Sequence, residues 1–91
     1  LGGEPMPLTT GLQFTNTLAA NQTQRFFSSG WNPAQHVVWY VMPVTPRPGA
    51  AELQWSVGVE RASLTECIYW ITVTNLTATA ITFEGRYAIL G

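Results

Sequence analysis

The 91-residue chain has no lysine and no aspartate, and it has only one cysteine and one histidine. The single cysteine, Cys67, has no second cysteine in the chain with which to form a disulfide. A structural zinc site normally draws on a cluster of cysteine and histidine ligands, which Cys67 and His36 alone cannot supply. We therefore expect no internal disulfide, no metal and no cofactor.

Charge is also scarce. Charged residues make up 10 % of the chain, against a usual share of about 25 %, and the net charge is −1. Neutralising nucleic-acid phosphates requires several basic side chains on one face, whereas the four arginines here are scattered along the sequence. We expect no nucleic-acid partner. Anionic membrane surfaces also recruit basic residues, so the composition argues against a membrane partner as well.

Long apolar runs are missing too. The run from Val37 to Met42 is far too short to span a bilayer as a helix. No basic segment followed by an apolar run opens the chain, so no secretory signal is visible. Small β-sandwich modules of secreted proteins have a generally similar look, but this fold-level analogy does not fix a location, and the sequence leaves the localisation open, a secreted or cell-surface one included.

The clearest pattern in the chain spans residues 52–60, in which every second side chain is apolar. The apolar residues are Leu53, Trp55, Val57 and Val59. A period of two places alternate side chains on opposite faces of a strand, whereas a helix would scatter these four around its axis. The pattern predicts a β-strand that buries this apolar face in the core.

Five further segments are typical of strands, and turn-forming glycine, proline and asparagine residues separate them. A short turn over residues 19–22 joins the first two, which favours a hairpin between them. Gly85 lies inside the last segment, where a glycine indicates a bulge or a close approach of backbone. The five segments are residues 12–18, 23–29, 35–42, 66–74 and 80–90.

Six strand segments, each separated from the next by a turn or loop, predict an antiparallel all-β domain. We expect a small β-sandwich of about six strands, with a small β-barrel as the alternative. Residues 1–11 contain three glycines and two prolines without periodicity, so we expect an extended N-terminal arm there. Residues 12–91 then form a single all-β domain.

Catalysis has little support in the sequence. A Ser-His-Asp triad cannot form without an aspartate. Cys67 falls on the apolar face of a predicted strand, where a thiol behaves as a small hydrophobic group. Glu60 and Glu66 flank one connection, but Glu60 is next to Arg61, and exposed ion pairs are the simpler interpretation. We expect that the protein is not an enzyme.

Aromatic residues give the main functional hint, because several of the four Trp, three Tyr and four Phe fall outside the alternation that would bury them. An aromatic ring suits the C–H face of a sugar, while amide and guanidinium groups hydrogen-bond its hydroxyls. Trp31 lies in a predicted loop, where binding groups often occur. The leading hypothesis is a non-catalytic, lectin-like carbohydrate-binding module. Its candidate ligand-binding residues are Trp31, Asn32, Gln35, His36, Arg47 and Arg86.

The same aromatic excess supports two other functions. Aromatic residues are enriched at protein interfaces, and one small core cannot hide every apolar side chain of this sequence. We therefore predict a homo-oligomer with Trp39, Ile68 and Trp70 as candidate interface residues, which makes a structural oligomerisation domain the alternative function. A membrane-active β protein that contacts lipid through residues 37–42 is the third.

Two tripeptides match the pattern for N-glycosylation, and both fall in predicted turns. They begin at Asn21 and Asn75. A three-residue pattern arises easily by chance in a threonine-rich chain, so we expect both matches to be coincidental.

Overall fold

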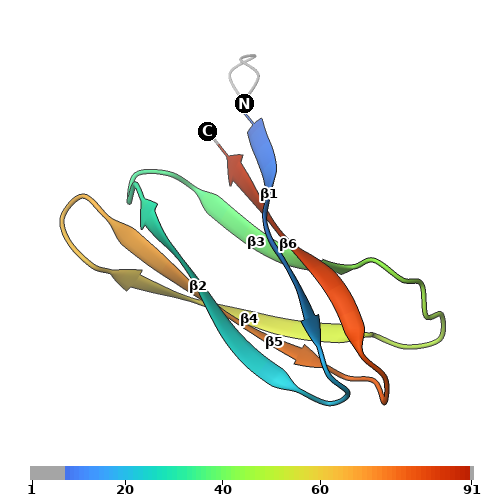
Figure 1. Ribbon diagram of the computed structural model, residues 1–91. Helices are drawn as coiled ribbons and strands as arrows, with labels where there is room; N and C mark the ends of the chain where they lie inside the picture. The colour runs from blue at the N-terminus through green and yellow to red at the C-terminus, as the bar shows by residue number, and fades with distance from the viewer. Residues whose placement is uncertain (1–7, 91) are drawn as a thin grey trace.

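The computed structural model describes residues 8–90, which form two three-stranded antiparallel sheets (Figure 1). This confirms the predicted small β-sandwich, and these residues do not close into the alternative barrel. Sheet A has the strand order β1-β6-β3, and sheet B has the order β2-β5-β4. The strands are β1 (Leu8–Leu18), β2 (Thr23–Trp31), β3 (Val37–Pro43), β4 (Leu53–Arg61), β5 (Cys67–Asn75) and β6 (Ile81–Leu90).

The first strand begins earlier than the sequence indicated. Leu8 pairs with Leu90, so residues 8–11 of the expected arm belong to β1, while residues 1–7 lie outside the described residues. Within residues 8–90 there is no helix long and apolar enough to cross a membrane.

The predicted hairpin between the first two strands is wrong, because β1 pairs with β6 whereas β2 pairs with β5. The turn at residues 19–22 instead carries the chain from one sheet to the other. Its Asn21 N–H donates to the carbonyl oxygen of Thr77 at 3.1 Å, in the turn that carries β5 to β6. A short polar turn is compatible with either connection, since the choice depends on distant partner strands that local sequence does not reveal.

Gly85 has the close contact that its position in a strand indicated. The pairing of β1 with β6 shifts in register between Leu12 and Phe14, and the Phe14 ring then lies directly against Gly85. A Cβ atom at position 85 would collide with that ring. Only glycine therefore allows β1, β6 and the Phe14 ring to pack this closely.

The core lies between the sheets and is made by the alternate apolar residues of both. The predicted inward residues of β5 behave as expected, since Cys67, Ile71 and Val73 are buried and Tyr69 is half-buried. The buried hydrophobic cluster consists of Leu18, Trp39, Val41, Leu53, Ile71, Val73, Ile81 and Phe83.

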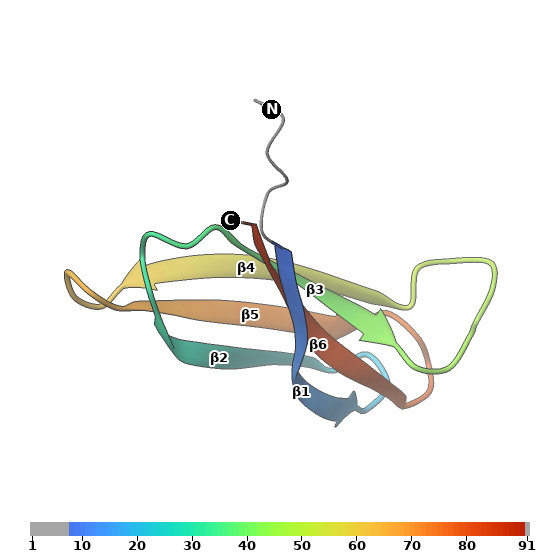
Figure 2. The same ribbon diagram turned by 90° about the horizontal axis from the view of Figure 1, so that it is seen from above.

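The apolar face of β4 departs from its prediction, because only its first residue is buried. Side-chain exposure rises along the strand, from 8 % at Leu53 through 37 % at Trp55 and 43 % at Val57 to 65 % at Val59. Figure 2 shows the reason: the strands of the two sheets cross at an angle, and the β4–β5 hairpin extends beyond sheet A. The alternation correctly defines the face, but no second layer covers most of it.

Asn75 connects the two turns at the opposite end of the sandwich and is completely buried. Its Nδ2 donates to the carbonyl oxygens of Leu18 at 3.2 Å, Ala19 at 3.0 Å and Thr79 at 2.8 Å. Its Oδ1 accepts from the backbone N–H of Thr77 at 2.9 Å. The side chain of Asn75 is therefore not accessible for glycosylation in the folded protein, because its nitrogen is buried and donates to backbone carbonyl groups.

Candidate functional site

The predicted ligand residue Trp31 belongs to the core rather than to an exposed loop. It ends β2 and is half-buried, with its ring centroid 5.3 Å from Tyr87, 5.4 Å from Trp39 and 6.1 Å from Tyr69. Its Nε1 donates to Ser28 Oγ at 2.9 Å. Because its polar atom and much of its ring are already engaged, Trp31 presents little surface to a ligand.

Three other predicted ligand residues lie in the β2–β3 loop beside Trp31. Asn32 is exposed, and its Oδ1 accepts from the Ala34 N–H at 2.9 Å. Gln35 is half-buried and His36 is exposed. The structure thus brings Trp31, Asn32, Gln35 and His36 to one end of the molecule, but the aromatic ring at their centre is mostly covered.

The two predicted arginines are separated from this loop and from each other. Arg47 is exposed in the loop beyond the other end of β3. Arg86 lies on the outer face of sheet A, where it bonds Glu84 at 2.6 Å and sits 5.7 Å from the Tyr40 ring centroid. The hydrogen bonds to Glu84 raise the pKa of the Arg86 guanidinium above its usual value.

Arg47 lines an open hollow of about 520 Å³ formed mainly by residues 42–48. Glu52 also lines it, and the two carboxylate oxygens of Glu52 are buried without a hydrogen-bond partner among the described residues. The hollow contains no aromatic side chain. It therefore lacks the ring that the sequence hypothesis requires for a sugar.

The three predicted interface residues also divide between core and surface. Trp39 is only 6 % exposed and packs inside the molecule, so its ring is not available to a second copy. Ile68 and Trp70 are half-buried and point outward from sheet B. Trp70 therefore stands on the outer face of sheet B.

The outer face of sheet B is a polar surface that carries an aromatic pair. On β5, these are the side chains that alternate with the buried inner ones. On β2 and β4, they are the residues paired with those outward residues of β5. Most of them bear hydroxyl, amide or charged groups. The outward residues are Thr23, Arg25 and Phe27 from β2, Ile68, Trp70, Thr72 and Thr74 from β5, and Gln54, Ser56, Gly58 and Glu60 from β4.

Phe27 and Trp70 are directly paired across β2 and β5, with ring centroids 5.5 Å apart and ring planes tilted by 43°. The Arg25 guanidinium lies 4.6 Å from the Trp70 ring centroid, and Trp70 Nε1 donates to Glu60 Oε1 at 2.9 Å. Side chains from the two neighbouring strands, β2 and β4, thus hold the indole of β5 in place. We call Phe27, Trp70, Arg25 and Glu60 the aromatic platform.

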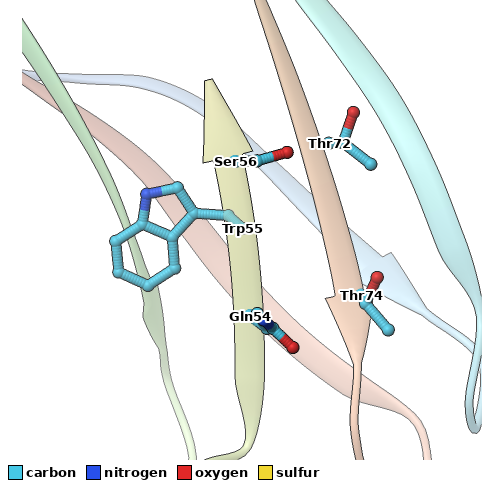
Figure 3. A pocket seen from close by; sticks show the side chains of 5 residues that line it. All are labelled: Gln54, Trp55, Ser56, Thr72 and Thr74. Carbon is cyan, nitrogen blue, oxygen red and sulfur yellow. The ribbon is translucent and has the colours of Figure 1, made fainter. Parts of the chain in front are cut away.

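A shallow depression of about 280 Å³ lies on the same face, lined by Gln54, Trp55, Ser56, Thr72 and Thr74. Figure 3 shows Ser56, Thr72 and Thr74 together along β4 and β5, while the Trp55 indole projects away from the two threonines. Thr72 pairs with Arg25 on one side and Ser56 on the other. The depression therefore borders the aromatic platform and offers hydroxyl groups next to it.

Gly58 leaves the sheet bare beside the platform. It is the cross-strand neighbour of Trp70, and a Cβ built there would meet no described atom within 4 Å. A ligand can therefore approach the backbone closely at this position.

This face has the parts of a binding site and lacks those of a catalytic or metal site. Its charged residues are Arg25 and Glu60, and Glu60 is engaged by Trp70. No group of three or more potential metal ligands occurs among residues 8–90. The arrangement can hold a flat, hydroxyl-bearing molecule, but it offers no paired acid and base.

Sequence reasoning named Trp70 as a candidate interface residue but missed Phe27, Arg25 and Glu60 as its companions. The alternation of residues 66–74 shows which side chains share a face. It does not show which residue of β2 lies opposite Trp70, because register depends on the pairing of whole strands.

No protein-family model, curated protein or solved structure matches this chain.

Proposed function

We propose that this domain is a non-catalytic carbohydrate-binding module whose binding surface is the outer face of sheet B. The supporting observation is the outward-facing Phe27–Trp70 pair on a sheet face that is otherwise rich in hydroxyl and amide groups. The function is the one expected from the sequence. The proposed residues, however, are those of the aromatic platform instead of the β2–β3 loop.

The chemistry of the platform suits a sugar ring. Phe27 is 64 % exposed and offers its ring to the C–H face of a pyranose, whereas Arg25 already covers part of the Trp70 ring. Arg25 and Glu60 stand at the edges of the pair, where they can hydrogen-bond hydroxyls. A second sugar unit fits the neighbouring depression, where Ser56 and Thr72 supply hydroxyl groups.

A sugar fits this face better than a protein surface does. The centre of a protein–protein interface is depleted in charged side chains and carries a contiguous apolar area. Here Glu60, a residue type depleted at such interfaces, accepts a hydrogen bond from the central indole, and threonines continue the face along β5. An aromatic pair surrounded by hydroxyl groups matches a ligand that alternates apolar C–H faces with polar rims.

Screening the protein on a glycan array, followed by titration with tryptophan fluorescence, tests the proposal. We expect saturable binding to one class of sugar, and we expect Phe27→Ala to weaken it about tenfold or more because a stacking ring is lost. Leu12→Ala is the matched control, since Leu12 is 56 % exposed on the outer face of sheet A. A blank array, or equal affinity for wild type and Phe27→Ala, contradicts the proposal.

A further inference from the structure

Four strands form the edges of the two sheets in the described chain, and β4 is the most regular of them. The pairing of β1 is interrupted between Leu12 and Phe14, and that of β2 between Ser28 and Trp31. The strand β3 is the shortest and ends at Pro43. Proteins protect edge strands from other chains with such interruptions, short lengths and prolines. In contrast, all nine residues of β4 pair with β5 in an unbroken register.

The edge of β4 is also apolar on one side. Trp55, Val57 and Val59 form an exposed row on the face that sheet A leaves uncovered. The strand has no proline and no lysine, and its charged residues Glu60 and Arg61 lie together at its end. An edge strand that is long, regular and apolar readily pairs with another strand.

Arg61 does not obstruct such pairing. Its Nε donates to the carbonyl oxygen of Ser63 and its Nη2 to that of Leu64, both at 2.9 Å. The guanidinium is thereby held over the β4–β5 turn, away from the row of apolar side chains.

We propose that β4 pairs antiparallel with β4 of a second copy of this chain, centred on Val57. The apolar residues occupy every second position, so this register places Trp55 beside Val59 of the partner subunit. It also places Glu60 beside Gln54 of the partner subunit. A parallel pair would place Glu60 against Glu60 and Arg61 against Arg61, so the distribution of charge favours the antiparallel, two-fold arrangement.

The product is one continuous six-stranded sheet with the order β2-β5-β4-β4-β5-β2. The two apolar rows become neighbours on its inner side, and each reduces the exposure of the other to water. The free N–H and C=O groups along the two β4 edges find partners in the same step. This interface uses neither Trp39 nor the aromatic rings of the platform, and of the platform residues only Glu60 lies on β4.

Sedimentation of wild type and two matched variants tests the pairing. We expect a reversible dimer, and we expect Val57→Lys to raise its dissociation constant about 100-fold or more because two added ammonium groups would face each other at the axis. Val38→Lys is the control, because Val38 is similarly exposed, at 49 % against 43 % for Val57, but lies on the outer face of sheet A. It should leave the dissociation constant unchanged.

Near-ultraviolet circular dichroism of each variant establishes that it remains folded. If Val57→Lys does not fold, Val59→Lys replaces it, because Val59 is the most exposed residue of the row. Hydrogen exchange supplies a second readout, with alternate amides of residues 55–59 protected only in the dimer. A wild-type protein that sediments as a monomer at millimolar concentration overturns the proposal. So does a dimer that Val38→Lys dissociates and Val57→Lys does not.

Discussion

At the scale of single residues, Asn75 shows how one polar side chain can fix the connectivity of a small sandwich. Both chain crossings at its end of the molecule, the β1–β2 turn and the β5–β6 turn, depend on carbonyl groups that its amide satisfies. A buried carbonyl group that is left without a hydrogen-bond donor lowers the free energy of unfolding. The side chain therefore replaces the hydrogen bonds that a hairpin ladder would otherwise have supplied.

Replacing Asn75 by aspartate tests this role, because it preserves shape but removes the donor. We expect Asn75→Asp to lower the free energy of unfolding by about 3 kcal/mol or more, since three carbonyl oxygens would face an acceptor. Denaturant unfolding measures the loss. Asn32→Ala is the control, because Asn32 is exposed and its side chain accepts a hydrogen bond from the Ala34 N–H. A loss below about 1 kcal/mol for Asn75→Asp would show that the turns hold without it.

At the scale of strands, the pairing of β1 with β6 depends on the absence of a side chain at one position. The Phe14 ring occupies the space over Gly85, and it also stacks on Phe26 with ring centroids 4.9 Å apart. Phe26 belongs to sheet B, so this contact joins the two sheets. A side chain at position 85 must therefore displace a ring that both layers need.

We expect Gly85→Ala to destabilise the fold by about 1–3 kcal/mol through overpacking. Gly58→Ala provides a comparison at a second strand glycine, where the added methyl meets open space and alanine is the better strand former, so stability should be unchanged or slightly higher. Thermal and denaturant unfolding of the two variants decide the matter. Equal effects at both positions would mean that backbone freedom, not the Phe14 contact, explains Gly85.

The strands themselves were largely readable from alternation, whereas their partners were not. The inward side chains of β5 followed the pattern because β5 is the central strand of its sheet and is covered by a second layer. Val57 and Val59 on β4 followed the same pattern but remain exposed. Periodicity reports which side chains share a face, while burial depends on whether a distant element covers that face.

The candidate site was predictable to the same extent. The position of Trp70 on an outer face followed from one strand, but its contacts with Arg25 and Glu60 come from the other two strands of sheet B. Gly30 and Pro33 flank Trp31 closely, a composition that predicts a loop. The strand instead continues through Gly30, which has a φ of 83°, and this delivers the Trp31 ring to the core.

At the scale of the whole molecule, four aromatic rings join the two sheets near the uncovered end. Trp31 and Tyr69 come from sheet B, and Trp39 and Tyr87 come from sheet A. Burial raises the pKa of Tyr69 above its usual value of 10.0, and the neighbouring Cys67 adds to this shift. The folded state therefore favours the neutral phenol.

This shift predicts an alkaline limit to stability. In the unfolded chain Tyr69 ionises near its usual pKa of 10.0, so its contribution is complete below that pH and is lost as the pH rises through the higher folded-state value. We expect the unfolding midpoint of the wild type to fall between pH 9 and values above pH 10. The midpoint of Tyr69→Phe should fall less over the same range. An identical decline in both proteins would assign the effect to other groups.

The strand β4 is an edge strand of sheet B, and the aromatic platform lies on the outer face of the same sheet. In the proposed dimer, a two-fold axis perpendicular to the joined sheet keeps both outer faces on one side of that sheet. Two platforms would then lie on the same side of the joined sheet, and a polysaccharide bound to both would dissociate only when both sites release it together. Such bivalent capture gains avidity on long or densely repeated glycans while leaving single sugars weakly held.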